Sequence, residues 1–258
     1  MLPTYNEAEN IEPFVLALRR HLAPAGRRHK LLIVDDSSPD GTGQIADRIA
    51  DEIQDVEVLH RAAKRGLGPA YLAGFRHALA RGADVVVQMD SDFSHDPADV
   101  GRLTAAVESC DLVLGSRYVP GGGIEGWGTI RRVVSAGGCW YARKVLRVPV
   151  RDLTGGFKCF RRHVLADLVE TLQAATSHAN GYAFQVETTY RVLLRGHRVH
   201  ELPIVFRDRR AGSSKMTWRI ALEAAWRVPA LLAAGRPARL SYSAGEEGTQ
   251  RRRRVGKG

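Results

Sequence analysis

The chain has 258 residues, of which 44% are hydrophobic and 26% charged, enough to bury one sizeable core in a single α/β domain with a tail. A formal net charge of +10 indicates an anionic partner, such as nucleic acid, a nucleotide sugar, a lipid phosphate or an acidic membrane, without choosing among them. Three cysteines without a CxxC pair argue against a disulfide framework and a thiolate metal site. Free cysteines of this kind are typical of proteins in the reducing cytosol.

Short apolar strands alternate with helical patterns through the first half of the chain. We expect helices between the strands, and parallel strands joined in this way form a sheet that helices cover on both faces. The predicted fold class is therefore α/β with a mainly parallel central sheet, in which ligands gather at the carboxyl ends of the strands. The expected strands are 31–35, 56–59, 84–90 and 111–116, and the expected helices are 40–53, 69–81 and 97–108.

Acidic and polar clusters stand at three of these strand ends. PTYNEAEN follows a strand stub at the start, DDSSPDGT follows LLIV, and DSDFSHDP follows VVVQM. In extended geometry Asp90 and Asp92 share a face, where their carboxylates suit Mg²⁺ or Mn²⁺. An isolated DxD more often only caps the next helix, here near Pro97, but the neighbouring clusters favour a metal site.

The second half predicts one packed helix and a less certain C-terminal segment. Residues 182–195 carry an apolar stripe at helical spacing, and we interpret Glu187 within it as a structural or positioning residue. The apolar segment 216–232 is too short and interrupted to span a bilayer, so it is either an interfacial helix or a final helix docked on the core. We expect 236–258 to be a disordered basic tail, either attracted to anionic lipid or simply solvated. The stripe consists of Ala183, Val186, Tyr190, Leu193 and Leu194.

Eight motifs in series carry a resemblance to a known family. From Leu2 to about Lys215 they are LPTYNEAENI, VDDSSPDGT, GLGPAY, MDSDFSHDP, GSRYVPGGG, DLTGGFKCFRR, GYAFQVE and FRDRRAGSSKM. In these motifs the chain resembles the polyprenol or dolichol monophosphate mannose synthases, which are inverting glycosyltransferases of family 2 with the GT-A fold. The resemblance implies a GT-A catalytic domain over 1–235, GDP-mannose as donor, a polyprenyl or dolichyl phosphate as acceptor, and Mg²⁺ or Mn²⁺ as cofactor.

The resemblance also implies which residues bind the nucleotide. A proline and an aromatic ring offer a flat apolar surface, while carboxylates accept hydrogen bonds from guanine nitrogens or ribose hydroxyls. Asp40 precedes Gly41, and we interpret it as a turn and helix-capping residue instead. The implied pocket for base and ribose consists of Pro3, Tyr5, Glu7, Val34 and Asp36.

By the same comparison, Asp90, Ser91 and Asp92 contact the sugar nucleotide and the metal. Ser94 is a weaker metal ligand at a position where some relatives have glutamine. We leave His95 out of the catalytic set, because a single histidine entering a helix is more often a surface or capping residue.

Three cations match the phosphate-binding positions of the family: Arg117, Arg209 and Lys215. Arg131 and Arg132, at the start of a helix after GWG, either approach the acceptor phosphate or are solvated. The predicted catalytic set is Asp90, Asp92 and Arg117.

The implied reaction is an in-line displacement in which the lipid phosphate attacks the anomeric carbon and inverts its configuration. A phosphate monoester has its second pKa near roughly 6, so it is largely dianionic at neutral pH and needs no strong general base. The resemblance places the chain peripherally on the cytoplasmic face of the membrane. Because no run of about 18 apolar residues occurs, we expect a membrane-spanning partner protein.

Two alternatives and one departure from the family stand beside this hypothesis. Another donor such as UDP-glucose would use the same scaffold, although DLTGGFKCF favours mannose. A basic module that binds nucleic acid is disfavoured, because Asp36, Asp90 and Asp92 would repel phosphate unless a cation intervened. The strand before PTYNE is reduced to Met1 and Leu2, so either the start lies upstream or the short strand weakens the base pocket.

Overall fold

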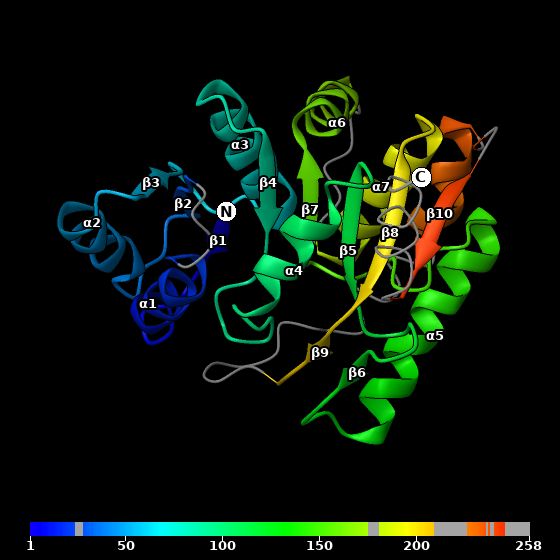
Figure 1. The fold of residues 1–258 in the computed structure, drawn as a ribbon, viewed down its shortest axis with the longest axis horizontal. Helices are drawn as coiled ribbons and strands as arrows, with labels where there is room; N and C mark the ends of the chain where they lie inside the picture. The colour runs from blue at the N-terminus through cyan, green and yellow to red at the C-terminus, as the bar shows by residue number, and fades with distance from the viewer. Residues whose placement is uncertain (24–27, 175–180, 209–225, 236, 238–239, 246–258) are drawn as a thin grey trace, which may run out of the picture.

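The alternating apolar runs form strands close to the expected places, and the patterns between them form helices (Figure 1). The computed structural model describes residues 1–23, 28–174, 181–208, 226–235, 237 and 240–245. The strands are β1 (Leu2–Thr4), β2 (Leu31–Asp35), β3 (Val56–His60), β4 (Val85–Gln88), β5 (Leu112–Ser116), β6 (Gly123–Ile124), β7 (Lys158–Arg161), β8 (Arg198–Pro203), β9 (Val205–Phe206) and β10 (Ser241–Ala244). The helices are α1 (Ile11–Leu22), α2 (Thr42–Glu52), α3 (Leu67–Ala80), α4 (Asp99–Ala106), α5 (Thr129–Leu146), α6 (Arg162–Ala174) and α7 (Tyr182–Leu194), with a short 3₁₀ turn at Leu231–Ala234.

The strands pair mainly in parallel, as predicted. β1, β2 and β3 form one parallel sheet, and a second sheet has the order β10-β8-β5-β7-β4. The amino group of Met1 donates to the Val87 carbonyl at 2.8 Å, so β1 lies beside β4 and the two sheets adjoin. The sequence did not predict β7, which runs antiparallel between β4 and β5.

Helices cover both faces of the sheet, because successive strand residues point to opposite sides. On β5, Val113 joins a core cluster with α1, α2 and α4, whereas Leu112 and Leu114 join a cluster with α3, α5, α6 and α7. Both clusters are fully buried at these strand positions. Because the helices lie on the two faces of the sheet, they leave the carboxyl ends of the parallel strands uncovered.

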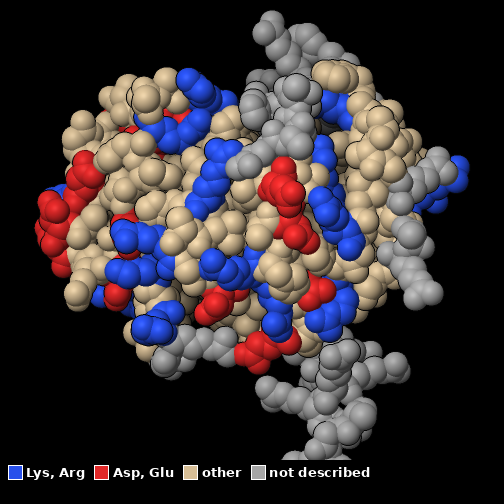
Figure 2. All heavy atoms as spheres, turned by 90° about the horizontal axis from the view of Figure 1, so that it is seen from above, with Lys and Arg blue, Asp and Glu red and all other residues tan. Residues whose placement is uncertain are grey.

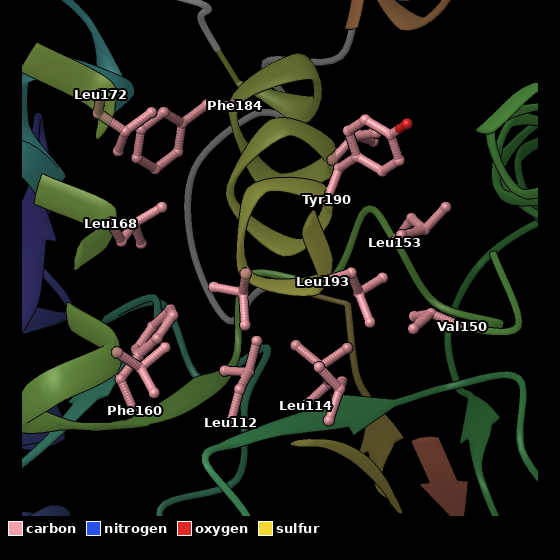
Figure 3. Close-up of a cluster of buried hydrophobic side chains, with 14 of the residues drawn as sticks. Leu112, Leu114, Val150, Leu153, Phe160, Leu168, Leu172, Phe184, Tyr190 and Leu193 are labelled. Atoms are coloured by element: carbon pink, nitrogen blue, oxygen red, sulfur yellow. The ribbon is translucent and has the colours of Figure 1, made fainter. Parts of the chain in front are cut away.

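The predicted stripe at 182–195 packs as expected. Figure 3 shows Tyr190 and Leu193 of α7 above Leu112 and Leu114 of β5, with Phe160 of β7 beside them. Tyr190 also donates from its hydroxyl to the Gly235 carbonyl at 2.7 Å. Helix α7 is therefore a core helix, and this part of the sequence interpretation is confirmed.

The C-terminal part differs from the expectation. Ser241–Ala244 form β10, which pairs in parallel with β8, so these four residues are not disordered. The edge of β8 offers unpaired backbone groups, and the Tyr242 hydroxyl donates to buried Glu201 at 2.5 Å, which fixes the added strand. Residues 246–258 lie outside the described residues, and the division at 235 stays a prediction.

The segment predicted as either interfacial or docked is described only from residue 226. Val228 is buried in the core, whereas the Trp226 side chain is exposed. Residues 216–225 lie outside the described residues. Among the helices that the structure describes, none is both long enough and apolar enough to cross a membrane.

Candidate active site

A cleft of about 300 Å³ opens at the carboxyl ends of β1, β2, β4 and β5. Parallel α/β sheets bind ligands at this edge, because the side chains that follow each strand converge there. The cleft brings together most of the residues that the sequence predicted from separate motifs. These are Pro3, Tyr5, Glu7, Asp36, Asp90, Ser91, Asp92 and Arg117.

Two predicted residues, Val34 and Ser94, do not line the cleft, and two others lie outside the described residues. The Val34 side chain packs against Leu32 and Ala70 in the core, on the α3 side of β2, and its contact with the nucleotide stays a prediction. Ser94 is buried behind Asp92 and donates from its hydroxyl to Asp92 Oδ1 at 2.6 Å, which makes it a residue that orients the carboxylate. Arg209 and Lys215 lie outside the described residues.

Asp36 and Tyr5 lie at one end of the cleft beside a loop that the sequence analysis did not include. Asp36 accepts hydrogen bonds from the Arg61 guanidinium and from the Gly66 backbone N–H, the latter at 3.1 Å. The Lys64 ammonium lies 3.6 Å from the centre of the Tyr5 ring. Asp36 therefore holds this loop against the cleft, and Lys64 adds a cation beside the aromatic ring. Asp40 caps the turn before α2 through Thr42, as expected.

Asp90 and Asp92 reach the cleft through a bend. β4 already ends at Gln88, and Phe93 has a left-handed φ of 63°, so the extended geometry that we assumed for the pair is wrong. Asp92 is held by two hydrogen bonds from Ser94, and Asp90 accepts one from the Tyr71 hydroxyl at 3.4 Å. Both carboxylates nevertheless line the cleft.

The two carboxylates fit a hard divalent cation. Mg²⁺ and Mn²⁺ take oxygen ligands and are commonly held by one or two carboxylates together with water and substrate phosphate. Asp90 and Asp92 supply such oxygens on the cleft wall, with Ser94 fixing one of them. When bound, the ion would offset the negative charge of a diphosphate leaving group.

His95 lies at the cleft and is buried, whereas the sequence favoured a surface or capping position. Its ring is buried, stacks on Phe157 with 5.0 Å between ring centres, and accepts the Asp90 backbone N–H at Nδ1 over 3.1 Å. Burial lowers its pKa, although Asp90 and Asp92 pull the other way, so the neutral ring is favoured. It is a positioning residue for Asp90 rather than a surface or capping residue.

Arg117 lies on the cleft wall in a buried ion pair. Its guanidinium donates to Asp152 through Nε at 2.7 Å and through Nη2 at 2.6 Å, and its backbone N–H adds a third bond at 2.9 Å. Burial disfavours the charge on Arg117, but Asp152 more than offsets this and raises its pKa. Glu201 in turn accepts the backbone N–H of Asp152 at 2.8 Å, so a chain of buried contacts fixes the orientation of the cation.

The far side of the cleft carries two buried N–H donors. The indole Nε1 of Trp127 and the Nε of Arg131 have no hydrogen-bond partner among the described residues, and both side chains line the cleft. Arg131 lies over the Trp127 ring at 3.9 Å and contacts Asp208 at 3.0 Å. A buried donor without a partner is costly, so these two groups favour an anionic ligand at this side of the cleft.

Strand β7 buries a lysine that forms no ion pair within the described part of the chain. The Lys158 ammonium is fully buried and donates to the Gln185 carbonyl at 2.8 Å. Gln88 next to it donates to the side chain of Gln185 at 3.0 Å, which ties β4 and α7 together under Asp90. Burial lowers the pKa of Lys158 to about 7, opposed in part by the Asp152 carboxylate.

This lysine predicts a pH dependence of stability. Between about pH 7 and 10.5 the unfolded chain binds a proton at residue 158 that the folded chain releases, so the free energy of unfolding rises with pH across this range, and the gain is lost as pH falls from 10.5 to about 7. We expect Lys158→Met to remove this slope. Between about pH 7 and about pH 9 the unfolding free energy of the wild type should therefore rise by about 2 kcal/mol relative to that of the variant. Urea unfolding at several pH values measures it, with exposed Lys30→Met as control. Parallel curves for wild type and Lys158→Met would contradict the burial of the charge.

The parallel-rich α/β sheet, with paired carboxylates and oriented cations at the strand ends, defines the GT-A class of nucleotide-sugar transferases. The model of the family described as glycosyl transferase family 2 matches residues 1–169, and the chain belongs to this family. The family and the fold class inferred from the motifs are thereby confirmed.

Relatives and solved structures extend the match. An undecaprenyl-phosphate mannosyltransferase of Micrococcus luteus is 45% identical over 224 residues, covering 87% of this chain and 89% of the relative. A polyprenol monophosphomannose synthase of Mycolicibacterium smegmatis is 43% identical over 230 residues, covering 88% and 84%. Glucosyl-3-phosphoglycerate synthase of Mycobacterium tuberculosis has a TM-score of 0.65 at 20% identity, covering 92% and 79%. A Pyrobaculum calidifontis mannosyltransferase in complex with GDP-Man and Mn²⁺ has a TM-score of 0.61 at 20% identity, covering 90% and 63%.

Proposed function

We propose that the chain transfers mannose from GDP-mannose to a polyprenyl phosphate with inversion at the anomeric carbon, releasing GDP. The names of the two sequence relatives support the sugar and the acceptor class. The solved mannosyltransferase with GDP-Man supports the donor through its fold. UDP-glucose remains the competing donor that a direct assay must test.

The observation that carries the proposal is the position of α5. Arg131 on this helix lines the cleft, while the same helix exposes Ile130, Val133 and Trp140 to solvent by 83%, 66% and 61%. Soluble proteins rarely leave such apolar groups together on one element without a use. A helix that faces both the cleft and an apolar medium suits an acceptor whose phosphate enters the cleft and whose tail stays in lipid.

Different residues of the cleft would bind the donor diphosphate and the acceptor phosphate. Asp90 and Asp92 would hold the cation that accompanies the diphosphate, with His95 and Ser94 fixing their orientation. The N–H groups of Trp127 and Arg131, which have no partner in the part of the chain that the structure describes, would hold the acceptor phosphate. A lipid phosphate is already dianionic, so the cleft needs no general base and the described cations serve to orient the attack.

Transfer of labelled sugar in detergent tests the proposal. The protein is incubated with a short polyprenyl phosphate and with either GDP-mannose or UDP-glucose, in Mg²⁺ or in chelator. Metal-dependent formation of a mannolipid from GDP-mannose is the expected result. Product from UDP-glucose alone would replace mannose as the sugar, and a retained anomeric configuration would reject inversion.

The apolar face of α5 leads to a separate prediction about membrane binding. Attachment at the membrane surface scales with buried apolar area, so Val133→Glu with Trp140→Glu should lower the fraction that floats with acidic liposomes at least about fivefold. Transfer to a short acceptor in detergent measures whether the cleft is intact. Exposed Leu16→Glu on α1 is the matched control.

The basic tail must be tested without disturbing the sheet. A chain ending at residue 245 keeps β10 and removes only 246–258. If this truncation abolishes flotation while the α5 variant floats like the wild type, the tail and not α5 holds the protein on the membrane.

A further inference from the structure

Three side chains of types that can bind a metal lie together at the end of the sheet opposite the cleft. Asp111 precedes β5, His163 lies in the first turn of α6, and His197 precedes β8. Arg117 at the other end of β5 lines the cleft, so a strand of five residues, roughly 17 Å long, separates the two places. In Figure 2 the molecule is seen from this end, away from β6 and β9, and acidic side chains stand among basic ones.

The side chains are close enough to share one ion. One ligand atom each from Asp111, His163 and His197 lie within 4.8 Å of one another. His163 Nε2 is 3.8 Å from Asp111 Oδ1, and the two imidazole rings have centres 5.5 Å apart. Small rotations of the exposed His163 ring would bring these atoms to the ligand spacing of a bound ion.

A fourth residue supports the histidine pair. Asp167 stands four residues after His163, on the same face of α6, and its Oδ2 lies 3.0 Å from His197 Nε2. Carboxylates that accept the second N–H of a metal-binding histidine fix its tautomer and ring orientation. Asp167 therefore either orients His197 or serves as a fourth ligand.

The donor set selects the kind of ion. Two imidazoles with carboxylate oxygens suit Zn²⁺ and its transition-metal neighbours, whereas Mg²⁺ prefers oxygen ligands and water. The Arg198 backbone N–H and Nε both donate to Asp111 Oδ2, at 2.8 Å and 3.2 Å, whereas among the described residues Asp111 Oδ1 accepts only Nη2 at 2.9 Å and so keeps a second lone pair for a metal. The site is thus chemically different from the pair of carboxylates in the cleft.

We propose that Asp111, His163 and His197, assisted by Asp167, form a second metal site that takes Zn²⁺ or a similar transition-metal ion. The ion links the start of β5, helix α6 and the segment before β8, three elements that are far apart in the sequence. Its role is to stabilise this end of the fold, independently of the ion used in the cleft.

Zinc titration of the full chain, without an affinity tag and in excess Mg²⁺, tests the proposal. We expect one Zn²⁺ to bind per chain and to raise the melting temperature by about 5 °C at saturation. His163→Ala should weaken binding at least about tenfold and remove the thermal shift, and Asp167→Asn should weaken it about tenfold or more. The His163 side chain is 57% exposed, so the metal-free variant should melt like the wild type.

The control is His21→Ala on α1, an exposed histidine outside the cluster, which should bind Zn²⁺ like the wild type. Bound Co²⁺ provides a second readout, because its visible absorption reports nitrogen ligands and should be lost in both His163→Ala and His197→Ala. Wild-type zinc affinity in His163→Ala, or no saturable zinc binding in the presence of Mg²⁺, would overturn the site.

Discussion

Asp92→Asn is expected to lower the rate of mannosyl transfer at least about 100-fold at saturating donor and Mg²⁺. The substitution keeps the shape of a buried side chain that Ser94 already orients, but it removes the negative charge that would hold the cation beside the diphosphate. Electrostatic groups that act on the charge developing in the transition state contribute on this scale. Initial rates of labelled mannolipid formation measure the effect, and thermal melting shows whether the variant is folded.

Asp96→Asn is the matched control for this loss. Asp96 belongs to the same loop, but it pairs with Arg207 at 2.7 Å on the surface and is not part of the cleft wall. Its transfer rate should stay within a few fold of the wild type. A folded Asp92→Asn enzyme that transfers at the wild-type rate would remove the metal role from the DxD motif.

Asp152→Asn is expected to cost about 3 kcal/mol or more of unfolding free energy. Asp152 and Arg117 are both buried, and removing one charge leaves the other without compensation in a medium of low polarity. Transfer should also fall at least about tenfold at temperatures where the variant is folded, because asparagine keeps only one acceptor oxygen and no charge, so the Arg117 guanidinium loses one of the two bonds that orient it. Urea unfolding and initial rates measure the two effects.

An exposed ion pair serves as the control for Asp152→Asn, because it shows the effect of losing a charge that is not buried. Glu12 contacts Arg48 at 2.6 Å, and both side chains are well exposed. Glu12→Gln should therefore change the unfolding free energy by about 1 kcal/mol at most and leave transfer unchanged. Equal losses in Glu12→Gln and Asp152→Asn would mean that the buried pair has no special part in stability.

Local patterns in the sequence determined the class of fold and the acidic residues of the site. Strand and helix periodicity placed the elements of the first half within a few residues, because alternation and helical spacing report which face of each element is buried. Acidic residues after strands converged as predicted, since parallel strands direct their carboxyl ends to one edge. These inferences needed only neighbouring residues and the general geometry of α/β sheets.

Contacts between distant segments decided the rest. Asp152 stands 35 residues from Arg117 and could not be paired with it from spacing alone. From its own motif His95 was expected on the surface, but its ring packs against Phe157 and Phe206 from distant parts of the sequence and is buried. Strand β7 enters the sheet antiparallel, and β10 is ordered by its pairing with β8. The sequence by itself therefore determined which chemistry the strand ends carry, whereas the tertiary structure decided which side chains are buried, paired and aimed into the cleft, because burial and long-range pairing depend on how the segments pack together.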